Sequence, residues 1–182
     1  MIKKLTHSQI SEKRLSTETL HLADKFPLYV LLDNIRSMYN VGSMFRTSDG
    51  IMIKKLLLTG YTPTPEKKEV LKTALGSADS VEWEYIKNPI HAIKRLKDEK
   101  IKIAALELTN KSINYTEVSK KDFPLCLIVG NEITGIQNLI LEQCDFSIDL
   151  PMFGIKHSLN VAVAYGVAVY ELRRKYFGYY KS

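Results

Sequence analysis

The sequence has few cysteines and no long apolar run. Cys126 and Cys144 are its only cysteines among 182 residues, and no two cysteines or histidines have the short spacing of a zinc site. Both cysteines lie in or beside apolar segments, so we expect two free thiols and no metal. No apolar stretch approaches the roughly 18 residues that a membrane-spanning helix needs. The first twenty residues lack the apolar core of a secretory signal, and we expect a cytoplasmic protein that is not bound to a membrane.

Three common ligand motifs are also missing. The glycine turn of residues 130–135 is followed by Ile136, where a phosphate-binding P-loop needs lysine. The sequence contains neither the G-x-G-x-x-G of dinucleotide-binding folds nor the G-x-S-x-G of a nucleophile elbow. These absences argue against an ATPase, a nicotinamide-dependent enzyme and a serine hydrolase.

The composition is that of one folded domain with a basic surplus. Apolar residues make up 45% of the chain and charged residues 25%. Lysine and arginine exceed aspartate and glutamate by 26 − 20 = 6. A basic excess permits a polyanionic partner such as RNA, although it is also a common route to solubility.

Apolar, β-branched runs alternate with helix-like patterns along the chain. Asn88 and Pro89 have the residue types of a helix cap and first helical position, and Ile90, Ile93 and Leu96 would form one apolar face after them. This alternation predicts the α/β class, with a mainly parallel sheet and helices on both faces. The expected strands are residues 29–33, 53–60, 81–86, 101–108, 125–130 and 146–152. Residues 1–26 read as a helical arm outside this domain.

Ligands of such sheets bind beyond the carboxyl ends of the strands, and three unusual loops lie there. In the first, Asn40 is a candidate helix cap and Gly50 a candidate helix end, with Arg46 off the apolar face. In the second, Gly130 and Gly135 flank a short turn that contains Glu132. In the third, Ser158 is a candidate cap for a final helix rich in alanine and glycine. Each feature alone has an ordinary structural interpretation.

Together the three loops resemble the SpoU/TrmH family of RNA 2′-O-ribose methyltransferases, within the SPOUT superfamily. The matching motifs are N-x-G-x-x-x-R-T from Asn40, G-x-E-x-x-G from Gly130, and P-M-x-G with S-L-N from Pro151. The resemblance covers residues 27–175 and implies a domain there with a C-terminal deep trefoil knot. It also implies a homodimer and S-adenosylmethionine as the cofactor. One departure is Ile133, which stands where many relatives have glycine.

The resemblance also assigns roles to individual positions. It makes Arg46 a catalytic position, and because a guanidinium resists deprotonation, we expect Arg46 to hold the adjoining phosphate and activate the 2′-hydroxyl electrostatically and not to act as a general base. The catalytic set that it implies is Arg46, Asn40, Glu132, Ser158 and Asn160. The cofactor-binding set is Gly130, Asn131, Leu150, Met152 and Leu159.

The expected substrate is structured RNA, with tRNA favoured over rRNA because the chain is compact. Residues 176–182 form a basic and aromatic C-terminal tail, suited either to RNA or to packing on the core. Two other functions stay open. They are methylation of a base nitrogen by a related knotted enzyme, and RNA binding without catalysis.

Overall fold

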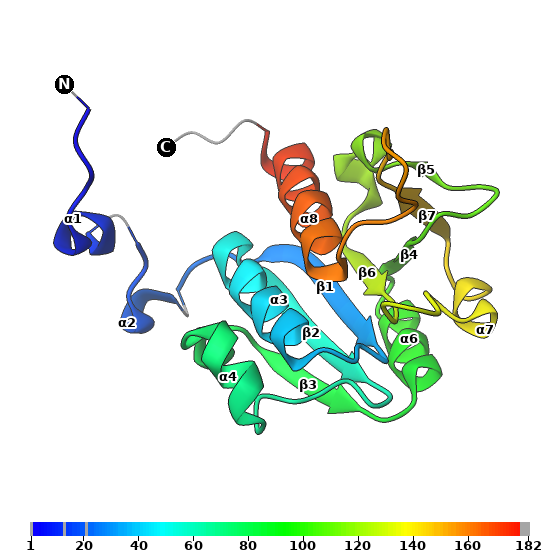
Figure 1. The fold of residues 1–182 in the computed structure, drawn as a ribbon, viewed down its shortest axis with the longest axis horizontal. Helices are drawn as coiled ribbons and strands as arrows, with labels where there is room; N and C mark the ends of the chain where they lie inside the picture. The colour runs from blue at the N-terminus through cyan, green and yellow to red at the C-terminus, as the bar shows by residue number, and fades with distance from the viewer. Residues whose placement is uncertain (1, 13, 21, 179–182) are drawn as a thin grey trace.

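The protein folds around one seven-stranded sheet, in a computed structural model that describes residues 2–12, 14–20 and 22–178 (Figure 1). All six strand pairings are parallel, and the strand order is β3-β2-β1-β6-β4-β7-β5. The predicted α/β class and parallel sheet are therefore confirmed. The strands are β1 (Phe26–Asp33), β2 (Ile53–Thr59), β3 (Trp83–Ile86), β4 (Lys102–Leu106), β5 (Ile113–Asn114), β6 (Leu125–Val129) and β7 (Phe146–Asp149).

All six expected apolar runs form strands, whereas the two-residue β5 was not expected. Successive residues of β1 alternate between two hydrophobic clusters: Val30 and Leu32 belong to one, and Leu31 belongs to the other. Because neighbouring side chains of a strand point to opposite faces, the sheet is buried on both sides. Because both faces are buried, the strands are continuous apolar runs in the sequence.

Helices cover both faces of the sheet. On one face lie α3 (Met38–Ile51), α4 (Lys68–Ala74), α5 (Ser77–Ser80) and α8 (Val161–Phe177). On the other lie α6 (Pro89–Asp98) and α7 (Asn138–Leu141). The single turns η1 (Tyr115–Glu117) and η2 (Lys120–Asp122) connect β5 to β6. The expected start of α6 is confirmed, since the Asn88 side chain accepts a hydrogen bond from the Ile90 N–H.

Three of the predicted helix boundaries are wrong. The cap of α3 is Ser37, whose hydroxyl accepts from the Asn40 N–H, so Asn40 lies within the first turn. Gly50 lies inside α3, which ends at Ile51 and is followed by Met52 as a cap in the left-handed conformation. The cap of α8 is Asn160 and not Ser158, because the side-chain oxygen of Asn160 accepts from the N–H groups of Ala162 and Val163. At both N-terminal caps, a neighbouring polar residue competes for the same role.

The end of α8 packs on the core. Tyr176 contacts the rings of Phe26 and Phe123, and Arg173 donates to the Ile51 carbonyl at 3.0 Å. The packing alternative therefore holds for the described part of the expected tail, and residues 179–182 lie outside the described residues.

The N-terminal arm contains two short helices, α1 (His7–Ser11) and α2 (Thr17–Leu20), and extends away from the sheet in Figure 1. No residue of α1 is buried. Across the described parts of the chain, no helix combines the length and the apolar character that crossing a membrane requires.

Candidate functional site

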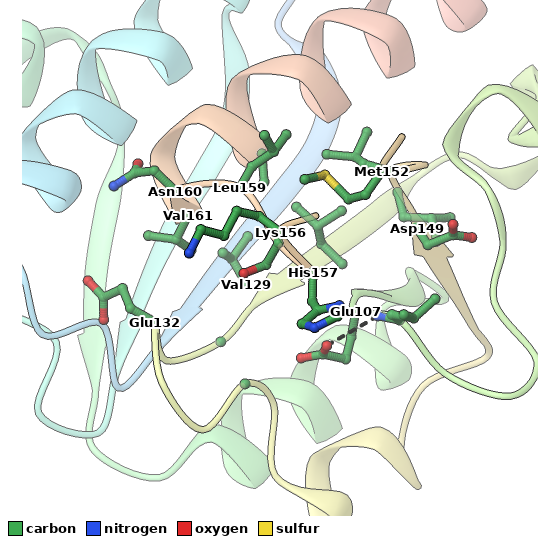
Figure 2. A pocket seen from close by; sticks show the side chains of 18 of the residues that line it. Glu107, Val129, Glu132, Asp149, Met152, Lys156, His157, Leu159, Asn160 and Val161 are labelled. Carbon is green, nitrogen blue, oxygen red and sulfur yellow. Dashed lines mark hydrogen bonds between the residues drawn. The ribbon is translucent and has the colours of Figure 1, made fainter. Parts of the chain in front are cut away.

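A cavity of about 530 Å³ opens at the carboxyl ends of β4, β6 and β7 (Figure 2). This volume lies within the range of cavities that bind small molecules and cofactors. Figure 2 shows side chains around it from the loops after β4, β6 and β7 and from the start of α8. Its apolar walls include Leu106, Val129, Ile148, Leu150, Met152 and Leu159.

The structure brings most of the predicted site residues to this cavity. All five expected cofactor residues line it: Gly130, Asn131, Leu150, Met152 and Leu159. Glu132, Ser158 and Asn160 line it as well. Asn40 does not line the cavity, but its side chain forms hydrogen bonds with Glu132 and Asn160, which do. Arg46 neither lines the cavity nor contacts its lining residues through a hydrogen bond.

Asn131 fixes the shape of the loop after β6. Its side-chain amide donates to the Asn34 carbonyl and to the Tyr61 hydroxyl, each at 2.8 Å. Its side-chain oxygen accepts from the N–H groups of Ile133 and Thr134 at 2.9 and 3.0 Å. The side chain thus joins the loop both to itself and to the ends of β1 and β2.

The two glycines of this loop are needed for its close return. Gly135 has a φ of +65°, in the left-handed region that side chains disfavour. A Cβ at Gly130 would stand 2.6 Å from Ile136 Cγ1 and 2.7 Å from the Ile136 nitrogen. The chain therefore turns back on itself more tightly than any other residue at position 130 would allow.

Glu132 joins this loop to the start of α3. Its carboxylate accepts from the Arg36 N–H at 2.9 Å, the Ser37 N–H at 3.1 Å and the Asn40 side-chain amide at 3.0 Å. Burial acts to raise the pKa of Glu132, but these hydrogen bonds outweigh it and hold the pKa below its ordinary value. An ionised carboxylate at this place also complements the helix dipole.

A chain of polar contacts leads from Glu132 into the third loop. Asn40 donates to Glu132, and its side-chain oxygen accepts from the Asn160 amide at 3.3 Å. Asn160 in turn caps α8. The first, second and third loops therefore meet at one polar cluster beside the cavity. Ser158 lines the cavity and makes no hydrogen bond to the described residues.

Arg46 lies elsewhere on α3. Its side chain is exposed and makes no hydrogen bond or ion pair with the described residues. It is six residues beyond Asn40, hence about 9 Å further along the helix axis and on a different face. Within one chain, the structure does not bring Arg46 to the cavity.

Four charged or titratable residues of the cavity were missed by the sequence reasoning: Glu107, Asp149, Lys156 and His157. Glu107 follows β4 and Asp149 ends β7, so the rule that ligands bind at the carboxyl ends of strands would have found both. Lys156 and His157 precede Ser158 in the third loop, and no pattern in the sequence marks them.

Comparisons with known proteins identify a family and a fold. A sequence model described as the SpoU rRNA Methylase family matches residues 27–170. A protein of Aquifex aeolicus named tRNA (guanosine(18)-2'-O)-methyltransferase is 34% identical over 170 residues, which are 91% of this chain and 78% of the relative. A putative TrmH family tRNA/rRNA methyltransferase of Bacillus subtilis is 31% identical over 82% of this chain, which spans only 59% of that relative.

Solved structures are similar over most of the chain. The A. aeolicus TrmH/SpoU tRNA modifying enzyme matches with a TM-score of 0.79 and 32% identity, covering 91% of this chain and 84% of that one. An AdoMet-bound rRNA methyltransferase of Sinorhizobium meliloti matches with a TM-score of 0.76 and 25% identity, covering 87% of this chain and 60% of that one.

Proposed function

Because the chain belongs to the SpoU rRNA methylase family, we propose that it transfers a methyl group from S-adenosylmethionine to a ribose 2′-hydroxyl of RNA. The observation that carries this proposal is the meeting of three loops at one place. The cofactor cavity of the second and third loops directly adjoins the polar cluster of Glu132, Asn40 and Asn160.

The cavity fits S-adenosylmethionine in size and chemistry. Apolar walls from Leu106, Ile148 and Leu159 are suited to an adenine ring, and Gly130 and Gly135 of the loop after β6 line the cavity with backbone atoms alone. When bound, the cofactor supplies a methyl group on a sulfonium, which leaves as a neutral thioether. The residues of the chain have the remaining tasks of orienting the ribose and excluding water.

The polar cluster holds the ribose in our proposal. Glu132 accepts hydrogen bonds from the N-terminus of α3 and from the Asn40 amide, which keeps that amide in one orientation. Asn40 in turn accepts a hydrogen bond from the Asn160 amide. Fixed amides beside the cavity place the 2′-oxygen in line with the methyl group. Such positioning contributes on the order of 7–11 kcal/mol in ideal cases.

The proposal includes a homodimer and a trefoil knot. Val163, Val167 and Tyr170 recur at helical spacing along α8 and are exposed, and Phe153 and Ile155 of the third loop are 95% and 94% exposed. Exposed apolar side chains in this number favour a second copy of the chain as their cover. The packing of α8 against η1 and η2, which precede β6, supports a C-terminal segment threaded through the chain before it.

Arg46 acts across this homodimer in our proposal. Arg46 and Gly50 share one face of α3, and a Cβ at Gly50 would stand 3.0 Å from the Tyr170 hydroxyl. Arg46 therefore borders the exposed stripe of α8, where a partner would pack. From there, its guanidinium would hold an RNA phosphate at the cavity of the other protomer.

Mixed dimers test the placement of Arg46. Arg46→Ala and Asn160→Ala are each expected to abolish turnover, and Arg46→Ala is expected to leave cofactor affinity unchanged. If the site is shared, an equal mixture of the two variants regains about a quarter of the wild-type activity, because half of random dimers are mixed and each has one complete site. No recovery in dimers that exchange subunits would contradict the shared site.

The substrate in our proposal is structured RNA, with tRNA favoured. The test is incubation of the protein with labelled S-adenosylmethionine and separated tRNA and rRNA, followed by nucleoside analysis. A 2′-O-methylated nucleoside supports the proposal. A methylated base would instead support a knotted base methyltransferase, and unlabelled RNA that is nevertheless bound would support a binding protein without catalysis.

A further inference from the structure

Glu107, directly after β4, lines the cavity and accepts backbone hydrogen bonds both from its own loop and from the loop after β6. Its Oε1 accepts a hydrogen bond from the Leu108 N–H at 3.1 Å, and its Oε2 accepts from the Ile136 N–H at 3.1 Å. Figure 2 labels the side chain at the cavity and draws a hydrogen bond from it. Both oxygens are thus directed by backbone groups, which leaves the carboxylate a single orientation.

The loop after β6 is shaped around this carboxylate. A Cβ added to Gly135 would collide with Glu107 Oε2, so the Gly135 backbone lies directly against the carboxylate. Asn131 and Glu132 connect the same loop to β1, β2 and α3 on its other side. Through Glu107, the loop is also hydrogen-bonded to the end of β4, at the lining of the cavity.

Asp149 differs from Glu107 in its contacts, although both carry a carboxylate at the cavity. It also contributes a carboxylate to the cavity lining, yet it makes no side-chain hydrogen bond to the described residues. A general requirement for negative charge near a cationic cofactor would not demand the paired backbone contacts of Glu107. Those contacts have the geometry of a clamp between two loops.

We infer that Glu107 is a positioning residue for the cofactor: it clamps residues 130–136 to the end of β4 and preorganises the cleft that S-adenosylmethionine enters. The identity of the ligand rests on the proposed function. A loop that is already ordered loses less entropy on binding, so the clamp lowers the dissociation constant of the cofactor without contacting the RNA.

The test compares Glu107→Gln and Glu107→Ala with Glu142→Gln, which makes the same chemical change at an exposed carboxylate on the α7 side. Calorimetry with S-adenosylmethionine and S-adenosylhomocysteine gives the dissociation constants. For Glu107→Ala we expect roughly a tenfold rise, equivalent to about 1.4 kcal/mol, and for Glu107→Gln a smaller rise, because one acceptor oxygen remains. We expect the KM for the cofactor to rise likewise, while kcat at saturating cofactor and the KM for RNA stay within about twofold.

Amide hydrogen exchange without cofactor gives a second measurement. The Ile136 and Leu108 amides should exchange faster in Glu107→Ala than in the wild type or in Glu142→Gln. A Gly135→Ala substitution should weaken cofactor binding more in the wild type than in Glu107→Ala, because removing the carboxylate removes the collision while the backbone strain is common to both.

The outcomes separate the inference from the proposed function. A wild type that binds neither ligand would refute the proposed function and the inference together. A wild type that binds both, with Glu107 variants of equal affinity and unchanged exchange at Ile136, would overturn the inference alone. A drop in kcat with unchanged cofactor affinity would also overturn it, because Glu107 would then act on the reacting groups.

Discussion

Two walls of the same cavity are built in opposite ways. The wall from the loop after β6, residues 130–136, is joined to its surroundings through Asn131, Glu132 and Glu107. The wall from the third loop, residues 151–159, has no hydrogen bond to the rest of the described chain, and its Phe153 and Ile155 are almost fully exposed. The first wall is held by hydrogen bonds within the described chain, whereas the second has none that hold it to the rest. Substitutions in the two walls should therefore affect different properties.

The largest effect is expected for Asn131→Ala, in the ordered wall. The substitution leaves several N–H and carbonyl groups of the loop without their partner, and we expect the free energy of unfolding to fall by about 2–4 kcal/mol with loss of cofactor binding. Denaturant titration and calorimetry measure the two effects. Asn110→Ala, at an exposed position in another loop, is the matched control. Equal stability of the two variants would show that the loop does not depend on Asn131.

A smaller, pH-dependent effect is expected for Glu132→Gln. Its carboxyl pKa is lowered by folding from an ordinary value of 4.5, so the ionised form stabilises the fold at pH values above 4.5. At neutral pH, we expect the variant to be less stable by about 1 kcal/mol, a modest value because the carboxylate is partly exposed to solvent. The difference should shrink as the pH falls below 4.5 and through the folded pKa. Unfolding curves from pH 3 to pH 7, with Glu142→Gln as control, measure it, and a difference that grows in acid would contradict this account.

The smallest effect on stability is expected for Phe153→Ser, in the open wall. The side chain is 95% exposed, so the free energy of unfolding of a monomer should change by less than about 0.5 kcal/mol. Association of two chains should weaken, which sedimentation equilibrium measures. Leu139→Ser, at an exposed site on α7, should leave association unchanged. If both variants dimerise like the wild type, the third loop lies outside the interface.

Hydrogen bonds within the loop after β6 connect neighbours in sequence. For this reason, the tight turn of this loop could be predicted from its motif. Asn131 bonds to Ile133 and Thr134, and Gly130 and Gly135 are fixed by the tight return of the same few residues. The capping residues of α3 and α8 could not be predicted in this way. Ser37 and Asn40 are equally suited to cap α3, and Ser158 and Asn160 are equally suited to cap α8. A choice between such neighbours depends on where the rest of the fold directs the chain.

The sequence by itself determined the parallel sheet, its apolar strands and the three loops at their carboxyl ends, because burial and turn geometry act over short stretches of chain. Only the tertiary structure decided which polar groups meet. Asn40 reaches partners 92 and 120 residues away in Glu132 and Asn160, and Glu107 reaches Ile136 across 29 residues. The same folding leaves Arg46 outside its own cavity. Contacts over such separations follow from strand order and helix packing, which no local pattern of residues encodes.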